Sequence, residues 1–129
     1  MPTTPIDKHG EFCWFEVNTP DAEAAKKFYG QLFGWKTQQM DMGGFPYHTL
    51  HLTEKPIGGI MPMTGPEWQG VPPHWMLYVA VDDVDAAARK VTELGGKVCV
   101  PPTTIPVGRF AVVNDPQGAT FSLFQAKPA

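Results

Sequence analysis

Two stretches of the chain are similar to each other: WFEVNTPDAEAAKK at residues 14–27 and YVAVDDVDAAARK at residues 78–90. When Val17 is aligned with Val81, several of the aspartates, alanines and lysines that follow also align, at a separation of 64 positions (81 − 17). This is half the length of a chain of 129 residues. Similarity at a fixed separation indicates a repeated structural unit. We therefore predict two copies of one module.

Each copy has the residue pattern of one strand, one helix and three further strands. In the first copy, residues 11–17 predict a strand, and the helix is expected to begin with Thr19 as its N-cap and to end at Gly34. Runs typical of strands follow at residues 35–40, 47–52 and 57–61. The second copy repeats the order, with a strand at 74–81, a helix capped by Asp82 or Asp83, and strands at 97–100, 108–113 and 119–125.

These elements predict the α+β class, built from two tandem βαβββ modules. Module 1 covers approximately residues 10–61 and module 2 approximately residues 74–126. A proline-rich linker, residues 62–73, connects them. Neither module is large enough to bury an adequate core alone. We therefore expect a single domain over residues 1–129.

The charge and composition of the chain limit its partners. The net charge is −3 and no segment is rich in lysine or arginine, so neither nucleic acid nor an anionic membrane is an expected partner. The expected partner is a small molecule or another protein. The start, MPTTPIDKHG, lacks the apolar core of a signal peptide and no later stretch is long enough to span a membrane, so a cytoplasmic protein is expected. Cys13 and Cys99 lie in apolar runs, which favours buried, reduced thiols.

Several motifs together resemble the vicinal oxygen chelate superfamily, which includes glyoxalase I, bleomycin-resistance proteins and extradiol dioxygenases. They are FYGQLFGW at the end of the first helix, VDDVDAA at the start of the second and DPQGATFSLF in the last strand. The resemblance covers Phe12 to Gln125 and is closest to the bacterial glyoxalase-like branch, which is related to lactoylglutathione lyase. It implies that the modules form a cup-shaped half-barrel, the glyoxalase/bleomycin-resistance/dihydroxybiphenyl-dioxygenase fold.

Metal-using members of this superfamily hold a divalent ion with His, Gln or Glu on the first and last strand of each module. The resemblance places the four corresponding positions at Phe12, Gly58, Met76 and Ser122. A register shifted by two residues would give Trp14, Ile60, His74 and Phe124. Only His74 among these could bind a metal well, and one imidazole does not make a site. We therefore predict no metal and no cofactor.

The alternation of side chains along a strand predicts which residues line the cup. Phe12 and Met76 are expected to point inward, and Leu50 and Leu52 to lie under the helix, which turns Tyr47, Thr49 and His51 inward and His48 outward. The predicted ligand-binding residues are Phe12, Trp14, Tyr47, Met76, Tyr78, Arg109 and Ser122.

Three features have a functional and a structural interpretation. Glu16 could orient His51 as a general base, or each could serve only the fold. Arg109 could bind an anionic group of a substrate, or it could pair with Asp115. Trp68 in the linker could close over the cup, or it could be a local clasp.

The leading hypothesis is a metal-free protein that binds an aromatic or amphipathic small molecule in the cup. The alternative is a lyase or isomerase related to glyoxalase, with Glu16 and His51 acting on a small carbonyl substrate. A third possibility is a purely structural or regulatory dimer. A homodimer is expected in each case, because the strands EFCWFEV and HWMLYVAV carry little charge to keep two copies apart.

Overall fold

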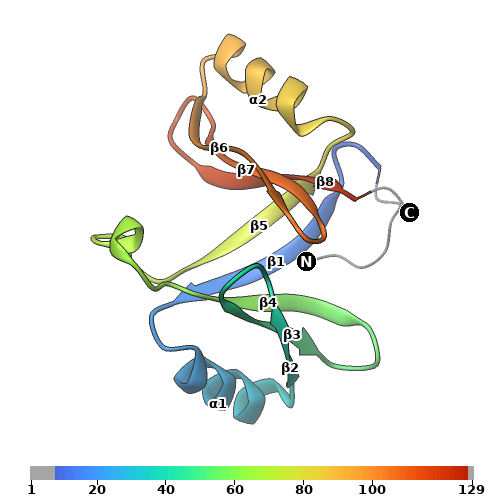
Figure 1. Cartoon of the computed structure of the whole chain (residues 1–129), viewed down its shortest axis with the longest axis vertical. Coiled ribbons are helices and arrows are strands. Elements are labelled where there is room, and N and C mark those ends of the chain that lie inside the picture. Colours follow the sequence, from blue (N-terminus) through green and yellow to red (C-terminus); the bar gives the residue numbers. More distant parts are fainter. Residues whose placement is uncertain (1–7, 128–129) are drawn as a thin grey trace. The chain divides into compact units, whose positions relative to one another are not determined.

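A computed structural model describes residues 8–127, which form two compact units (Figure 1). The first unit contains residues 15–75, and the second contains residues 8–14 and 76–127. The order of elements is βαβββ, repeated once, with one short 3-10 helix between the repeats. The α+β class and the tandem modules are therefore confirmed. The cup and the single-domain organisation stay predictions, and residues 1–7 of the N-terminal stretch lie outside the described part.

The first βαβββ repeat is a mixed sheet with one helix against it. Its elements are β1 (Phe12–Thr19), α1 (Ala22–Phe33), β2 (Lys36–Asp41), β3 (Pro46–His51) and β4 (Pro56–Pro62), followed by the 3-10 helix η1 (Pro66–Trp68). The strand order is β2-β3-β4-β1. β1 pairs with β4 in parallel, because α1 carries the chain back across the sheet, while the other pairs are antiparallel.

Helix α1 begins two residues later than predicted. The N-cap is Asp21, whose carboxylate accepts a hydrogen bond from the backbone N–H of Ala24 at 3.0 Å. Thr19 instead accepts from the backbone N–H of Asp21 at 3.2 Å, so it shapes the turn before the helix. The helix ends at Gly34, which has a φ of 78° as predicted for a glycine stop.

The face of α1 that meets the sheet completes a small apolar core. Val17, Leu50 and Ile60 are buried at its centre. Four partly buried side chains surround them: Ala22, Ala25, Tyr29 and Trp35. These contacts fix which face of the first unit's sheet lies under the helix and which face points away from it.

The second repeat has the same architecture. Its elements are β5 (His74–Ala80), α2 (Val84–Glu93), β6 (Lys97–Ile105), β7 (Gly108–Asn114) and β8 (Thr120–Ala126), and the strand order is β5-β8-β7-β6. Asp83 caps α2 by accepting from the backbone N–H groups of Asp85 and Ala86. The core under the helix consists of Val84, Ala111, Val113 and Leu123.

Two predictions about buried side chains are wrong. Leu52 is 63% exposed, because β3 ends at His51, where a bulge disturbs its pairing with β4. Cys99 is exposed as well, and Cys13 is only partly buried. In β6, Val98 and Val100 pair with Val113 and Val112, so Cys99 is the extra residue of a bulge and is turned out of the core.

Neither α1, with 12 residues, nor α2, with 10, is long and apolar enough to cross a lipid bilayer, and this holds for every helix within residues 8–127.

Candidate functional site

One face of the first unit's sheet, the face turned away from α1, carries a group of buried polar side chains. Glu16 of β1 is in register with Gly59 of β4, Gly59 with Thr49 of β3, and Thr49 with Gln38 of β2. Neighbouring residues along each strand, such as Val17, point to the core under α1. Alternation therefore places Glu16 and Thr49 on the other face.

The best-defined contact on this face joins Tyr47 and Glu16. The hydroxyl of Tyr47 donates a hydrogen bond of 2.8 Å to Oε1 of Glu16, and the two residues are 1% and 3% exposed. The ring of Tyr47 reaches β1 by passing over Gly59, where a Cβ atom would overlap the tyrosine hydroxyl. Gly59 is therefore needed for the contact, because any side chain at this position would displace the ring.

Asn18 lies on the same face, two residues beyond Glu16 on β1. Side chains two positions apart on a strand are separated by about 6.6 Å along it. Asn18 is 2% exposed, and its amide Nδ2 has no hydrogen-bond partner among the described residues. A buried amide N–H without an acceptor is costly, by about 1–3 kcal/mol. The Nδ2 group of Asn18 would therefore be stabilised by a hydrogen-bond acceptor that comes from outside the described residues, such as an oxygen atom of a ligand.

His51 continues the polar face at the end of β3. Its Nε2 lies 2.7 Å from Oγ1 of Thr49, whose hydroxyl donates its proton to the backbone carbonyl of Gln38 at 3.2 Å. A hydroxyl has one proton to donate, so which of the two groups donates in the contact between Thr49 and His51 depends on the tautomer of the ring.

The observed partner of Glu16 on this face is Tyr47, whereas the predicted partner was His51. Tyr47 and Thr49 share the face with Glu16, and His48 is on the side of α1, where burial lowers its pKa and Lys26 acts in the same direction. The hydrogen bond between Glu16 and Tyr47 was not predicted, although the two glycines at 58–59 are a sequence signal for a close approach. The Glu16–His51 pair stays a prediction.

In the second unit, Tyr78 and Ser122 are opposite each other on the parallel strands β5 and β8. Tyr78 packs edge-on against Phe124, with ring centroids 6.4 Å apart, and Met76 is buried two residues before Tyr78. Ser122 is fully buried, and its Oγ has no hydrogen-bond partner among the described residues. These side chains form the sheet face opposite α2.

Phe12 and Trp14, near the start of β1, differ in exposure. Phe12 is 67% exposed, whereas Trp14 is 3% exposed. Alternation places both on the same side of β1. Their roles in ligand binding stay predictions.

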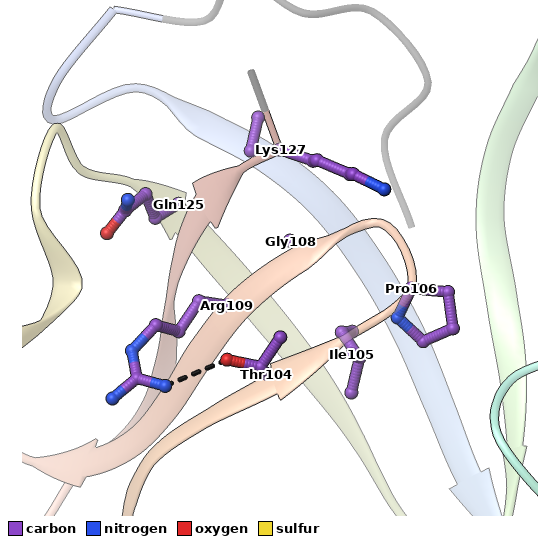
Figure 2. A pocket seen from close by; sticks show the side chains of 8 residues that line it. Thr104, Ile105, Pro106, Gly108, Arg109, Gln125 and Lys127 are labelled. Atoms are coloured by element: carbon purple, nitrogen blue, oxygen red, sulfur yellow. Dashed lines mark hydrogen bonds between the residues drawn. The ribbon is translucent and has the colours of Figure 1, made fainter. Parts of the chain in front are cut away.

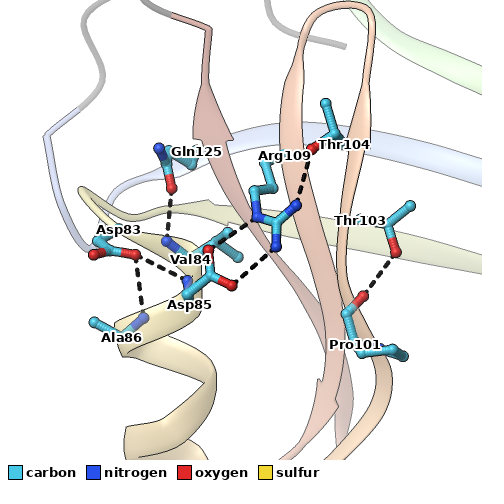
Figure 3. A network of polar contacts seen from close by, with 9 residues as sticks. All are labelled: Asp83, Val84, Asp85, Ala86, Pro101, Thr103, Thr104, Arg109 and Gln125. Carbon is cyan, nitrogen blue, oxygen red and sulfur yellow. Dashed lines mark hydrogen bonds and ion pairs between the residues drawn. The ribbon is translucent and has the colours of Figure 1, made fainter.

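Arg109 has a structural partner that sequence reasoning missed (Figure 3). Its Nε and Nη2 donate to the two carboxylate oxygens of Asp85 in α2, each at 2.9 Å, and Nη1 donates to Thr104 at 2.9 Å. Of the two interpretations of Arg109, the pairing with Asp115 is wrong, because Asp115 accepts from the backbone N–H groups of Gln117 and Ala119 in its turn. Hydrogen bonding to Arg109 lowers the pKa of Asp85, and the same bond raises the pKa of Arg109.

This pair predicts a pH-dependent contribution to stability. We expect Asp85→Asn and Arg109→Ala each to lower the melting temperature slightly at neutral pH, because a partly exposed pair contributes little. The double variant should lose less than the sum of both single losses. Because the pKa of Asp85 is lower in the folded than in the unfolded protein, the pair contributes fully to stability above the unfolded pKa of 3.8. This contribution is lost as the pH falls through the folded pKa. Thermal melts that show the same Asp85→Asn deficit at neutral and strongly acidic pH would contradict this.

Arg109 also lines a surface pocket of about 480 Å³ beside the β6–β7 hairpin (Figure 2). The other lining residues are Thr104, Ile105, Pro106, Gly108, Gln125, Ala126 and Lys127. Oε1 of Gln125 accepts a hydrogen bond from the backbone N–H of Val84 at 2.8 Å. The polar side chains of Gln125 and Arg109 are therefore already used to hold α2 on its sheet, and we place the candidate site elsewhere.

The positions that correspond to a metal site need one correction. Glu16 pairs with Gly59 at a separation of 43 (59 − 16), whereas Ala80 pairs with Phe124 at a separation of 44 (124 − 80). The position equivalent to Ser122 is therefore Ile57, not Gly58. Gly58 faces α1, since a Cβ atom there would lie 3.8 Å from Cδ1 of Leu50, which belongs to the core under that helix.

Ile57 is no better as a metal ligand than Gly58. Residues 8–127 contain no group of three or more His, Cys, Asp or Glu side chains that could hold a metal ion. That the protein uses no metal stays a prediction. Elemental analysis of the metal content per chain tests it directly.

The model of one protein family, the Glyoxalase/Bleomycin resistance protein/Dioxygenase superfamily, matches residues 12–123. The chain belongs to this superfamily. The resemblance seen in the helix ends and in the last strand is thereby confirmed. The solved structures agree: methylmalonyl-CoA epimerase from Mycobacterium tuberculosis has a TM-score of 0.64, over 99% of this chain and 93% of that chain. At 16% identity, this likeness shows the fold alone.

Curated relatives are more similar in sequence. "Putative glyoxylase CFP32" from Mycobacterium tuberculosis is 40% identical over 97% of this chain and 48% of that protein. "Anthracycline biosynthesis protein DnrV" from Streptomyces peucetius is 33% identical over 90% of this chain and 47% of that protein. The chain thus spans about half the length of these relatives.

Proposed function

We propose that this superfamily member binds a flat aromatic small molecule with hydroxyl or carbonyl groups, without a metal. The binding surface would be the polar face of the first unit that carries Glu16, Asn18 and Tyr47. The observation that carries the proposal is the buried amide of Asn18, whose Nδ2 has no hydrogen-bond partner within residues 8–127. A ligand oxygen would supply the acceptor that this N–H group needs.

The remaining groups on the face suit such a ligand. The Glu16 carboxylate accepts from the Tyr47 hydroxyl, and a carboxylate can accept several hydrogen bonds, including one from a ligand hydroxyl. Met61 is in register with Asn18, and Met40 with Tyr47, and both are partly buried. Methionine adapts to the shape of an aromatic ring and makes favourable contacts with it. The face therefore combines a few directed polar groups with an apolar surface, as small-molecule sites do.

The names of the relatives support the class of ligand. The two Streptomyces relatives are named as anthracycline biosynthesis proteins and are 33% and 34% identical to this chain. Anthracyclines contain a flat ring system with quinone and phenol oxygens, which matches the donors and acceptors of the face. A homodimer and a cytoplasmic location remain part of the proposal.

Thermal melting with a panel of ligands tests this function. We expect hydroxylated polycyclic quinones, including an anthracycline, to raise the melting temperature, because a ligand that binds only the folded state stabilises it by about 2.7 kcal/mol at one hundred times its Kd. Aliphatic alcohols and ketones of similar size are the control and should have no effect. A panel in which no aromatic ligand changes the melting temperature would contradict the proposal.

The enzymatic alternative rests on one observation, the buried Glu16 carboxylate held by a tyrosine hydroxyl. A lyase or isomerase would use Glu16 or His51 as the base that removes a proton next to a substrate carbonyl. Product formation from a ligand found in the panel distinguishes this alternative. If turnover is found, Glu16→Gln and His51→Ala should each reduce it by about 10²–10⁴, and unchanged rates would limit both residues to structural roles.

A further inference from the structure

The second unit has a pocket of its own beside the β6–β7 hairpin, formed by residues 104–109 and 125–127, which we call the hairpin pocket (Figure 2). Its volume of about 480 Å³ is within the usual range of small-molecule sites. Thr104 of β6 is in register with Arg109 of β7, and Arg109 with Gln125 of β8. Residues directly opposite each other share one face of a sheet. The pocket therefore contains a row of three polar side chains, on the face that contacts α2.

The hydrogen bonds of this row use its acceptors inside the protein (Figure 3). The atom of Gln125 that faces the backbone N–H of Val84 has to be the acceptor Oε1, so Nε2 is left to donate elsewhere. Oγ1 of Thr104 accepts from Nη1 of Arg109, and its own proton remains. Arg109 gives one N–H each from Nε, Nη1 and Nη2 to Asp85 and Thr104, which leaves a second N–H on each Nη. The row can therefore mainly donate to a ligand.

The charges around the hairpin pocket favour an anion. The charged side chains that line it are Arg109 and Lys127, and both are cations. Asp85 neutralises Arg109, whereas Lys127 has no ion-pair partner among the described residues. Asp83 is another acid near Arg109, but its carboxylate caps α2 and does not line the pocket. One positive charge, that of Lys127, is thus left without a countercharge.

The remaining side chains of the hairpin pocket are apolar. They belong to Ile105, Pro106 and Ala126, and Ile105 and Ala126 are partly buried. An inorganic anion gains nothing from such a surface, whereas the hydrocarbon body of an organic anion is stabilised when it leaves water. A carboxylate accepts hydrogen bonds without donating any, and its bonds to arginine and lysine are strengthened by charge. A carboxylate on a small apolar body therefore matches both parts of the pocket.

We propose that the hairpin pocket is a second ligand site, which binds a small organic carboxylate. The carboxylate oxygens accept from donors of Arg109, Gln125 and Lys127, and the apolar body lies on Ile105, Pro106 and Ala126. The proposal does not rest on the proposed function, because it uses no residue of the polar face of the first unit. A failure of one proposal leaves the other intact.

A ¹H–¹⁵N NMR titration of the full chain with benzoate tests the proposal. We expect saturable shifts of the side-chain amide of Gln125 and of the backbone N–H groups of Gly108 and Arg109, with a Kd on the order of 1 mM, usual for so small a ligand. Benzyl alcohol keeps the ring but has no charge, and inorganic phosphate has charge but no apolar body. Both should bind at least about 10-fold more weakly, because each lacks one of the two interactions.

Gln125→Glu is the sharpest variant, because it changes the donor and keeps the acceptor. Glutamate has the shape of glutamine and can still accept from the backbone N–H of Val84, so α2 should stay in place and the melting temperature should change little. Its second oxygen would face the carboxylate of the ligand in place of Nε2. We expect the affinity for benzoate to fall by at least about 10-fold, since a hydrogen bond to a charged group is replaced by repulsion.

Lys127→Gln and Lys97→Gln form a matched pair that tests the charge. Both lysines are exposed in the second unit, but Lys97 is at the opposite end of β6, in register with Asn114. Lys127→Gln should weaken benzoate binding by about 5-fold, the upper range for an exposed ion pair, and Lys97→Gln should leave it unchanged.

Three results would overturn the proposal. One is the absence of saturable benzoate shifts at Gly108, Arg109 and Gln125. Another is binding of benzyl alcohol or phosphate as tight as that of benzoate, which would exclude the organic carboxylate as the ligand class. The third is an unchanged benzoate affinity in a folded Gln125→Glu variant, or an equal loss in both lysine variants, because the affinity would then not depend on the donors of the pocket.

Discussion

Gly59→Ala is expected to destabilise the protein by about 2 kcal/mol or more, within the range for overpacking a close-packed interior and losing a buried hydrogen bond. The added methyl group would occupy the place of the Tyr47 hydroxyl and would lie 2.5 Å from Cζ. Tyr47 is 1% exposed and has little room to move. Displacing it would break its hydrogen bond to Glu16. Gly59 has no positive φ, so the effect is steric and not one of backbone strain.

Double variants separate this cause from a general loss of stability. Tyr47→Phe should not rescue Gly59→Ala, because ring carbons at 2.5 and 2.7 Å from the new methyl group remain. Tyr47→Ala removes the obstacle, so Gly59→Ala should cost little in that background. The measurement is chemical denaturation of the single and double variants, analysed as a double-mutant cycle.

Gly30→Ala is the matched control for the glycine substitution. A Cβ atom at Gly30 would meet only the backbone carbonyl of Trp35, at 3.3 Å, and alanine is the better helix former. We expect this variant to lose much less stability than Gly59→Ala, because the carbonyl has to move by only a few tenths of an ångström, in contrast to the overlap at Gly59. An equal loss of stability for Gly30→Ala and Gly59→Ala, or a full rescue by Tyr47→Phe, would contradict the position assigned to the tyrosine ring.

Glu16→Gln is expected to weaken binding of an aromatic hydroxyl ligand by about 10- to 100-fold, because hydrogen bonds to a charged group contribute about 1.5–3 kcal/mol. The amide keeps the shape of the carboxylate but loses its charge and one acceptor oxygen. Isothermal titration with a ligand from the melting panel measures the change. The free protein should keep most of its stability, since glutamine can still accept from the Tyr47 hydroxyl.

Glu23→Gln provides the matched control for Glu16→Gln. It removes the same charge from the first unit, but Glu23 is on the solvent side of α1, where it pairs with Lys26. Ligand affinity should be unchanged in this variant. If both substitutions weaken binding equally, the effect is one of overall charge, and Glu16 does not contact the ligand.

Local patterns in the sequence were sufficient to predict the elements of the fold. The aromatic and branched residues of β1 and the glycine after α1 act within a few positions, so they can be recognised without knowledge of the rest of the chain. The cap of α1 was assigned two residues too early, because Thr19 and Asp21 are both good N-cap residues and only the backbone geometry selects Asp21.

The long-range contacts of the site could not be predicted from these patterns. The Tyr47–Glu16 bond joins residues 31 positions apart, and the Arg109–Asp85 pair joins residues 24 positions apart. Alternation gave the correct face for Tyr47 but not the direction of its ring over Gly59. The assignment of Gly58 failed for a related reason, because the extra residue between the paired strands of the second repeat does not show in the aligned motifs.

The side-chain amide of Asn18 provides the most direct test of the proposed site. Two-dimensional ¹H–¹⁵N NMR resolves side-chain amides, and the Asn18→Ala spectrum assigns this signal by its loss. We predict that adding a ligand from the melting panel shifts the Asn18 Nδ2 signal as its N–H gains an acceptor. A saturating ligand that leaves this signal unchanged, and shifts only signals of the Gln125 and Lys127 pocket, would contradict the proposed location of binding.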